Sequence, residues 1–355
     1  MAENVNGTLV HSTGHYGDPV AVCMADVQAQ NVDWLWYPYL AYGQLALLEG
    51  DPDVGKSMLT LQIATCLSRG WALPDQHGEL YAIPPVPRST IFVASEDALS
   101  FTVCPRLIKM DADRNYIHVL QGLRGHDDGM LPFTLKDLTP LESMIKALHP
   151  ALVVIDPIQA YIPASANLNQ ANHVRWYMAK IIAMAEQYHC AVLCVRHATK
   201  SSGTGVAKAV HRGAGSVDIA AAARFILFVE QHPIDAFKHI GLMAHTKANI
   251  SPKGRTQLFR REHGQFGWCG VSRVQPELVA GNKRGPDPVK LLEAALWLEG
   301  FLWEGARDAG KLLEVAYEQG HTKGIIYAAK KALGIVSTRH QDDEGFVTIW
   351  ELSPL

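Results

Sequence analysis

Short apolar runs alternate along most of the chain with segments whose apolar residues recur at helical spacing. The apolar runs predict strands at 43–48, 89–97, 117–120, 150–157, 191–197 and 224–229. Helical spacing predicts helices at 56–68, 101–110, 138–148, 174–188 and 216–223. Two further runs, 240–244 and 256–261, predict a hairpin that completes the sheet. Strands and helices in alternation are typical of an α/β fold with a mostly parallel sheet.

The pattern divides the chain into four parts. Residues 1–30 mix Gly, His, Asn and Asp without periodicity, which indicates a flexible tail or a strap that reaches a neighbouring subunit. The α/β pattern occupies 31–278, and the composition of 279–288 indicates a linker. Beyond it, 289–355 predict three helices and a β-wing, an order typical of a small winged-helix-like domain.

The third of these C-terminal helices carries a concentration of positive charge. Thr322 is expected to cap this helix, which holds Lys323, Lys330 and Lys331. From 319 to 340 there are four basic residues and no acid. A DNA-binding face and a protein-docking face are both open interpretations of this segment.

Composition indicates a globular protein without a membrane segment. The chain has 355 residues, of which 48% are hydrophobic and 19% charged, so it can bury a large core. No apolar run reaches the roughly 18 residues that span a bilayer, and the first residues resemble no signal peptide. The six cysteines are scattered mostly through apolar segments, as expected for reduced thiols. We therefore expect a cytoplasmic protein that does not associate with membranes.

Two clusters have both a structural and a functional interpretation. His189, Cys190, Cys194 and His197 could be a metal site, but their spacing matches no zinc pattern and the cysteines fall in a predicted buried strand. The aromatic run 32–40 is interpreted as a packed edge of the α/β domain rather than a base-stacking platform, because aromatic side chains mostly stabilise proteins by burial.

The net charge is −3, yet the positive residues are concentrated in two places. Lys200, Lys208 and Arg212 lie in an acid-free segment rich in Gly and Ser, and a second acid-free basic region covers 247–261. Such a loop can follow the phosphates of single-stranded DNA, which makes these three residues the predicted DNA-binding residues. The alternative is a solvated, disordered lid.

A glycine-bearing loop joins the first core strand to the first helix. Residues 47–57 read LLEGDPDVGKS, the phosphate-binding loop pattern in its required context. Backbone N–H groups and the helix dipole attract phosphate there, Lys56 adds a full charge, and the Ser57 hydroxyl is a ligand for Mg²⁺. We predict ATP and Mg²⁺ as cofactors, with nucleotide-binding residues Gly50, Asp51, Pro52, Asp53, Val54, Gly55, Lys56, Ser57 and Met58.

Asp53 occupies a position where related loops usually have glycine, and Asp51 adds a second carboxylate. Like charges should weaken the binding of phosphate unless Mg²⁺ or basic partners offset them.

Three polar residues follow predicted strands at the edge where a parallel sheet meets its ligand. Asp156 closes a buried strand and is the expected Mg²⁺ ligand opposite Ser57. Glu96 is a candidate for orienting or deprotonating the attacking water, with a helix cap as the alternative. His197 is a candidate for contact with the γ-phosphate or the water, or else an ordinary core residue.

In chain order the motifs are GDPDVGKS, SED, VVIDP, RHATK, GSVDIAAAARF and TKAN. This ordered set resembles the RepA-like hexameric helicases, a branch of the RecA-like ATPases found in plasmids, phages and integrated elements. The resemblance covers roughly residues 31–275 and implies a RecA-like P-loop core and a ring of six subunits with ATP at the interfaces. It implies that Lys56 and Ser57 are the P-loop pair, Glu96 the catalytic glutamate, Asp156 the magnesium ligand and His197 the γ-phosphate sensor.

The resemblance also implies basic residues that act on a neighbouring subunit's site. Arg224 matches the arginine finger, where a cation stabilises transition-state charge. Lys247 matches a second basic finger at the nucleotide more loosely. Arg212 is a rival finger, because the segment between His197 and Arg224 does not align with the family without gaps.

Together these features predict an ATP-hydrolysing DNA helicase or translocase that acts as a homo-oligomeric ring on single-stranded DNA, in replication or recombination of a mobile element. Replication proteins or element-encoded proteins would be its partners. The alternative is a non-translocating RecA-like ATPase switch that binds DNA or a protein partner for regulation or defence. A third interpretation is a nucleotide-binding assembly protein with negligible turnover.

Overall fold

The computed structural model describes residues 22–78, 86–94, 98–125, 129–163, 171–197, 217–235, 238–274, 278, 287–342 and 345–353. The chain divides into two compact units, Met1–Asp33 and Trp34–Leu355. The described residues of the first unit are exposed and include one 3₁₀ turn, η1 (Met24–Asp26). None of the described helices is both long and apolar enough to cross a membrane.

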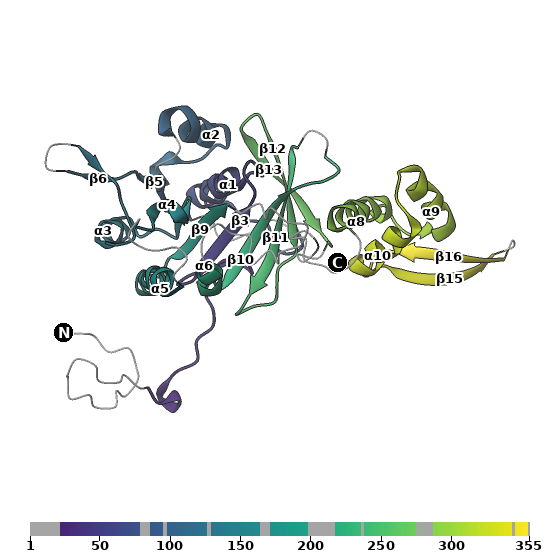
Figure 1. Cartoon of the computed structure of the whole chain (residues 1–355), viewed down its shortest axis with the longest axis horizontal. Coiled ribbons are helices and arrows are strands. Elements are labelled where there is room, and N and C mark those ends of the chain that lie inside the picture. Colours follow the sequence, from purple (N-terminus) through teal and green to yellow (C-terminus); the bar gives the residue numbers. More distant parts are fainter. Residues whose placement is uncertain are drawn as a thin grey trace. The chain divides into compact units, whose positions relative to one another are not determined.

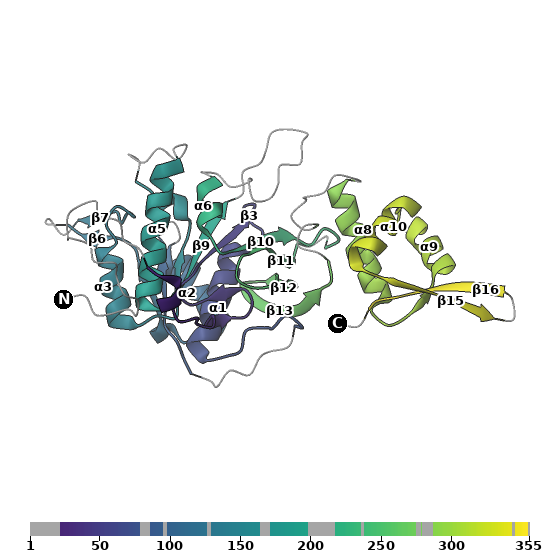
Figure 2. The same cartoon turned by 90° about the horizontal axis from the view of Figure 1, so that it is seen from below.

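A nine-stranded sheet is the largest sheet among the described residues, in the order β13-β12-β11-β10-β3-β9-β8-β4-β5. Six of its strands are parallel: β3 (Leu45–Gly50), β4 (Thr90–Val93), β5 (Ile117–Leu120), β8 (Leu152–Ile155), β9 (Ala191–His197) and β10 (Phe225–Gln231). Three antiparallel strands continue it beyond β10 (Figure 2): β11 (Ile240–Ala248), β12 (Thr256–Glu262) and β13 (Gln265–Ser272). The predicted α/β fold with a mostly parallel sheet is confirmed.

Helices cover both faces of the parallel strands (Figure 1). Alternate residues of β3 point to opposite faces, so Ala46 and Leu48 enter one core and Leu45 and Leu47 the other. The first core is closed by α1 (Lys56–Arg69) and α2 (Cys104–Lys109). The second is closed by α3 (Thr139–Leu148), α4 (Ile158–Tyr161), α5 (Ala171–Tyr188) and α6 (Val217–Ala222). A five-residue π-helical turn, η2 (Leu99–Val103), precedes α2, and a 3₁₀ turn, η3 (Arg114–Tyr116), precedes β5.

The aromatic run near the start of the second unit is a packed edge, as predicted. It forms the short hairpin β1 (Trp34–Trp36) and β2 (Leu40–Ala41). Tyr39 is fully buried, and its hydroxyl donates to the carbonyl oxygen of Arg255 at 2.7 Å and accepts from Nε2 of Gln257 at 2.9 Å. These bonds satisfy the hydroxyl inside the core, where a lone polar group would be costly.

His245 lies beside this edge as a buried, neutral imidazole. Its ring centroid is 5.4 Å from that of Tyr39 and 5.9 Å from that of Phe225, and its Nδ1 accepts from the N–H of Gly254 at 2.9 Å. Burial lowers the pKa of His245 to about 4. The pKa of His245 is lower in the folded protein than in the unfolded chain, so a neutral imidazole favours the folded state. This contribution to the free energy of unfolding is complete above pH 6.5 and is lost as the pH falls towards 4.

We expect the free energy of unfolding to fall by about 2 kcal/mol between pH 8 and pH 5 through His245 alone. His245→Asn keeps an acceptor near the Nδ1 position and removes the titration, so it should be less stable at pH 8 but lose about 2 kcal/mol less on acidification. Urea unfolding at both pH values measures this, with the exposed His77→Asn as the control. Equal pH dependence in His245→Asn and the wild-type protein would contradict the prediction.

The C-terminal residues form a separate small sheet with three helices (Figure 2). The elements are α8 (Pro288–Leu302), β14 (Arg307–Asp308), α9 (Ala309–Glu318), α10 (Lys323–Leu333), β15 (Val336–Asp342) and β16 (Gly345–Glu351), with strand order β14-β16-β15. The predicted cap at Thr322 is confirmed, since its hydroxyl accepts from the N–H of Ile325 at 3.4 Å. The sequence pattern predicts the second of these helices at 306–317, but α9 begins at Ala309 because Arg307 and Asp308 pair with β16.

Several strand segments were not predicted from the sequence, and they include the short β1, β2 and β14 described above. β13 pairs with β12 at the edge of the main sheet, where its residues are mostly half-buried or exposed and include two glycines, so no apolar run marks it. The two-residue strands β6 (Leu123–Arg124) and β7 (Met130–Leu131) form a small exposed hairpin. Runs this short carry no usable periodicity.

Candidate functional site

The phosphate loop connects Gly50, the last residue of β3, to Lys56, the first residue of α1. Gly50 lies so close to β10 that a Cβ atom there would be 2.3 Å from the carbonyl oxygen of Val229. Gly55 caps α1 with φ at 102°, in a region that side chains disfavour. Both glycines are therefore required by the backbone, and the first turn of α1 keeps free N–H groups for an anion.

The Lys56 side chain folds back over this loop. Its Nζ donates to the carbonyl oxygens of Gly50 at 2.9 Å and Asp51 at 2.7 Å. Only 5% of the residue is exposed, and this burial lowers the pKa of Lys56, while the carboxylates of Asp156, Asp51 and Asp53 act in the opposite direction. Two carbonyl dipoles thus hold the ammonium inside the loop, where phosphate oxygens would be stronger partners.

Ser57 and Asp156 meet although 99 positions separate them in sequence. The Ser57 hydroxyl donates to Oδ2 of Asp156 at 3.1 Å, because α1 begins at the carboxyl end of β3 and Asp156 follows the carboxyl end of β8. A hydroxyl and a carboxylate are oxygen ligands of the kind that Mg²⁺ prefers, and the ion usually completes its shell with water and phosphate oxygens. This pair fits the predicted magnesium site.

His197 lies at the same edge of the sheet. It is the last residue of β9, is exposed, and pairs in register with Gly50. The preceding residue, Arg196, forms a fully buried ion pair with Glu49, which lies opposite it on β3. Burial raises the pKa of the Glu49 carboxyl, and the positive charge of Arg196 opposes that shift. The strand of the phosphate loop and the strand of His197 are thus joined by a charged contact next to the site.

Arg224 and Lys247 lie at the other end of these strands. Arg224 precedes β10, is exposed, and donates its N–H to the carbonyl oxygen of Leu45, the first residue of β3. About five residues of strand, on the order of 17 Å, separate that position from Gly50. Arg224 therefore cannot reach the phosphate loop of its own chain.

Lys247 is engaged at this same end. Its Nζ donates to the carbonyl oxygens of Ala220, Ala221 and Ala223, at 3.0, 3.2 and 2.7 Å, where it satisfies the C-terminal end of α6. Burial lowers the pKa of Lys247, and the charge of Arg224 adds to that effect. Lys247 does not contact the phosphate loop of its own chain, so its nucleotide-binding role stays a prediction about a neighbouring subunit.

Four predicted site residues lie outside the described residues: Glu96, Lys200, Lys208 and Arg212. Their assignments stay predictions. Of the candidate metal cluster, Cys190 and Cys194 are buried in the core, and burial raises the pKa of their thiols to about 11 and about 12. Among the described residues no group of three or more His, Cys, Asp or Glu side chains could hold a metal ion.

The structure adds three charged residues that sequence reasoning missed: Glu49, Arg196 and Arg261. The first two carry a signal in the sequence, since each is a charged residue at the end of an apolar run. Arg261 lies in the basic region 247–261, but its approach to the phosphate loop depends on the antiparallel strands, which no local pattern reveals.

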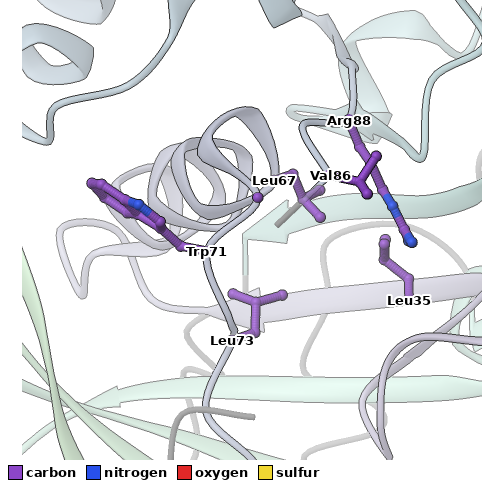
Figure 3. A pocket seen from close by; sticks show the side chains of 7 residues that line it. Leu35, Leu67, Trp71, Leu73, Val86 and Arg88 are labelled. Carbon is purple, nitrogen blue, oxygen red and sulfur yellow. The ribbon is translucent and has the colours of Figure 1, made fainter. Parts of the chain in front are cut away.

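A small apolar pocket lies at the opposite end of α1 from the phosphate loop (Figure 3). Leu67 lines it from the helix, and Leu35, Leu73 and Val86 complete the apolar wall. Arg88 borders it and donates a hydrogen bond to the hydroxyl of Tyr42. This pocket is separate from the phosphate site.

The sequence profile of the AAA domain family matches residues 18–203, just over half of the chain. Among solved structures, one titled "Crystal structure of the RadB recombinase" is 15% identical, with 64% of this chain and 91% of that chain covered and a TM-score of 0.45. No curated protein sequence matches the chain.

Proposed function

The chain belongs to the AAA domain family, and from that premise we propose that it binds ATP with Mg²⁺ in the phosphate loop and hydrolyses it. The observation that carries this proposal is the convergence of Lys56, Ser57 and Asp156 at one edge of a parallel sheet. These residues come from two strand ends about a hundred positions apart, and a cation, a hydroxyl and a carboxylate together form the chemistry for a metal-bound triphosphate.

Each residue has a distinct task in this proposal. Lys56 exchanges its two carbonyl partners for phosphate oxygens, and the free N–H groups at the start of α1 bind the same anion. Ser57 and Asp156 would hold Mg²⁺, which when bound neutralises charge on the phosphates. His197 lies beside Gly50 and is placed to contact the terminal phosphate or the water. Glu96 is the residue we propose to orient that water.

We further propose that the protein is a RecA-like motor that works as a homo-oligomeric ring, hexameric by resemblance, on single-stranded DNA. The position of Arg224 is compatible with a multi-subunit site, because this exposed arginine is a strand length away from its own phosphate loop, so any contact with a phosphate loop would be with a neighbour's. Lys200, Lys208 and Arg212 are the proposed contacts to the DNA phosphates.

Strand displacement measured beside ATP hydrolysis tests the motor proposal. We expect the wild-type protein to unwind a tailed duplex with ATP and Mg²⁺, and Lys56→Ala to lose both activities, since Lys56 is the only cation of the loop itself. ATP hydrolysis without unwinding would contradict the motor and favour a non-translocating switch that binds DNA or a protein for regulation or defence.

Asp53 in the loop provides a test of a third candidate function, that of an assembly protein with negligible ATP turnover. Asp53 is exposed and has φ at 64°, a conformation that glycine adopts without cost. A large rise in the hydrolysis rate in Asp53→Gly would favour this candidate over a motor.

We also propose that 289–355 form a winged-helix-like domain, joined to the ATPase domain by a linker at 279–288. The three helices, the order of the strands and the capped α10 support this proposal. Its Lys323, Lys330 and Lys331 would face DNA or a docking protein.

A further inference from the structure

Arg261, on β12, lies against the phosphate loop of its own chain. A Cβ atom on Gly55 would be 2.9 Å from Cδ, 3.1 Å from Nε and 3.3 Å from Cζ of Arg261. The Arg261 side chain therefore lies directly beside Gly55, the N-cap of α1.

Neighbouring residues hold the guanidinium in place. Its Nη2 donates to Oε1 of Gln231 at 2.8 Å, and the amide nitrogen of Gln231 donates in turn to the carbonyl oxygen of Ile240 at 2.5 Å. Nε of Arg261 is buried and has no hydrogen-bond acceptor among the described residues. A buried N–H group without an acceptor is costly, so this side chain has capacity for a further anionic partner.

Successive side chains of β12 point to opposite faces of the sheet, so Arg261 and Arg260 point in opposite directions. Arg260 points away from the loop, is largely exposed and pairs with Glu262 at 2.6 Å. Two adjacent arginines thus lie on opposite faces of one strand, and only the second contacts the loop. Arg260 is a matched control for Arg261.

The acidic residues near the loop indicate a role for the positive charge of Arg261. Asp51, Asp53 and Asp156 interact with the Lys56 ammonium, so three carboxylates surround one lysine at a site for a polyanion. Burial lowers the pKa of Arg261, and the carboxylate of Asp53, two positions before Gly55, acts against this shift. Arg261 thus lies beside the loop in the folded protein as a second cation next to Lys56, although it is far from the loop in sequence.

We propose that Arg261 is a nucleotide-positioning residue supplied in cis, which offsets the charge of Asp53 so that the phosphate loop accepts a nucleoside polyphosphate. This inference rests on the proposed function, since it assumes that the loop binds ATP. It explains why the loop tolerates an aspartate where a glycine is usual: the counter-charge comes from the hairpin β12–β13.

A double-mutant cycle in nucleotide binding tests this. The readout is the equilibrium Kd of a fluorescent ADP analogue with Mg²⁺. We expect Arg261→Gln to weaken binding about tenfold, equivalent to about 1.4 kcal/mol. In the Asp53→Asn background, which removes the charge and keeps a residue that tolerates positive φ, the same substitution should weaken binding less than threefold.

Two control variants separate charge from folding. Arg260→Gln should leave the Kd unchanged, and Arg261→Lys should keep most of the affinity because it keeps the charge. In the wild-type protein, the Kd should also rise more steeply with salt than in Arg261→Gln. If Arg261→Gln does not fold, the test uses the other two variants. Arg261→Lys should then keep most of the affinity, and Asp53→Asn alone should tighten nucleotide binding.

The outcomes distinguish this inference from the proposed function. Equal losses from Arg261→Gln in both backgrounds, or no loss at all, would overturn the role of Arg261 while Lys56→Ala still abolished binding. The proposed function itself would be contradicted if the wild-type protein bound no nucleotide, or if Lys56→Ala bound it with the same Kd as the wild-type protein.

Discussion

Asp156→Asn is expected to lower Mg²⁺-dependent ATP hydrolysis by about a hundredfold or more. The substitution keeps the size of the side chain and its hydrogen bond to Ser57 but removes the charge that attracts the ion. A metal ion at a phosphoryl oxygen contributes several kcal/mol to transition-state stabilisation, and about 1.4 kcal/mol corresponds to a factor of ten. The residual activity should require a higher Mg²⁺ concentration. The steady-state rate as a function of Mg²⁺ concentration measures both effects.

Glu318→Gln, an exposed carboxylate on α9, is the control for loss of charge alone and should leave the rate unchanged. Ser57→Ala should shift the Mg²⁺ dependence in the same direction as Asp156→Asn, since both side chains belong to one oxygen pair. An Asp156→Asn protein with the wild-type rate and Mg²⁺ requirement would remove Asp156 from the metal site.

Glu49→Leu is expected to lower the free energy of unfolding by about 3–5 kcal/mol, because it removes the carboxylate that pairs with a buried guanidinium. Both side chains of the Glu49–Arg196 pair are 1% exposed. The guanidinium of Arg196 cannot lose its proton under ordinary conditions, so the charge would stay in the core. Arg196→Met should cost less, because the remaining glutamic acid can take up a proton, and burial already raises its pKa.

Urea unfolding of both single variants and of Glu49→Leu/Arg196→Met measures these differences. The double variant should recover much of the lost stability, since an apolar pair of similar volume can replace a buried ion pair at little cost. Losses that simply add in the double variant, or a loss below 1 kcal/mol in Glu49→Leu, would show that the pair is not coupled as the structure indicates.

The position of the loop between β3 and α1, and that of Asp156 beside Ser57, could be predicted from the sequence because both are local patterns with a fixed structural context. A loop between an apolar run and a helical pattern has few conformations, and Gly50 and Gly55 fall where the backbone requires them. Asp156 follows an apolar run, and the carboxyl ends of parallel strands share one edge. The sequence could thus predict that Asp156 lies near Ser57, and the structure places the Ser57 hydroxyl 3.1 Å from the Asp156 carboxylate.

The order of the strands could not be obtained in the same way. β9 lies between β3 and β8, and this insertion brings Arg196 opposite Glu49. Nothing in either segment encodes that pairing, since each only shows an apolar run with a charged residue near its end. Arg261 is a stronger case: it reaches Gly55 from β12, which β11 and β10 separate from β3 in the sheet order. Contacts of this kind depend on long-range topology, which local periodicity does not contain.

We expect one ATP to bind in the phosphate loop of each chain with Lys56 as its principal cation, and a calorimetric titration tests this most directly. Titration of a slowly hydrolysed ATP analogue with Mg²⁺ should show saturable binding with one site per chain, and Lys56→Ala should show no measurable heat under the same conditions. Saturable binding of equal affinity in the wild-type protein and in Lys56→Ala would contradict it, since the nucleotide would then be held elsewhere.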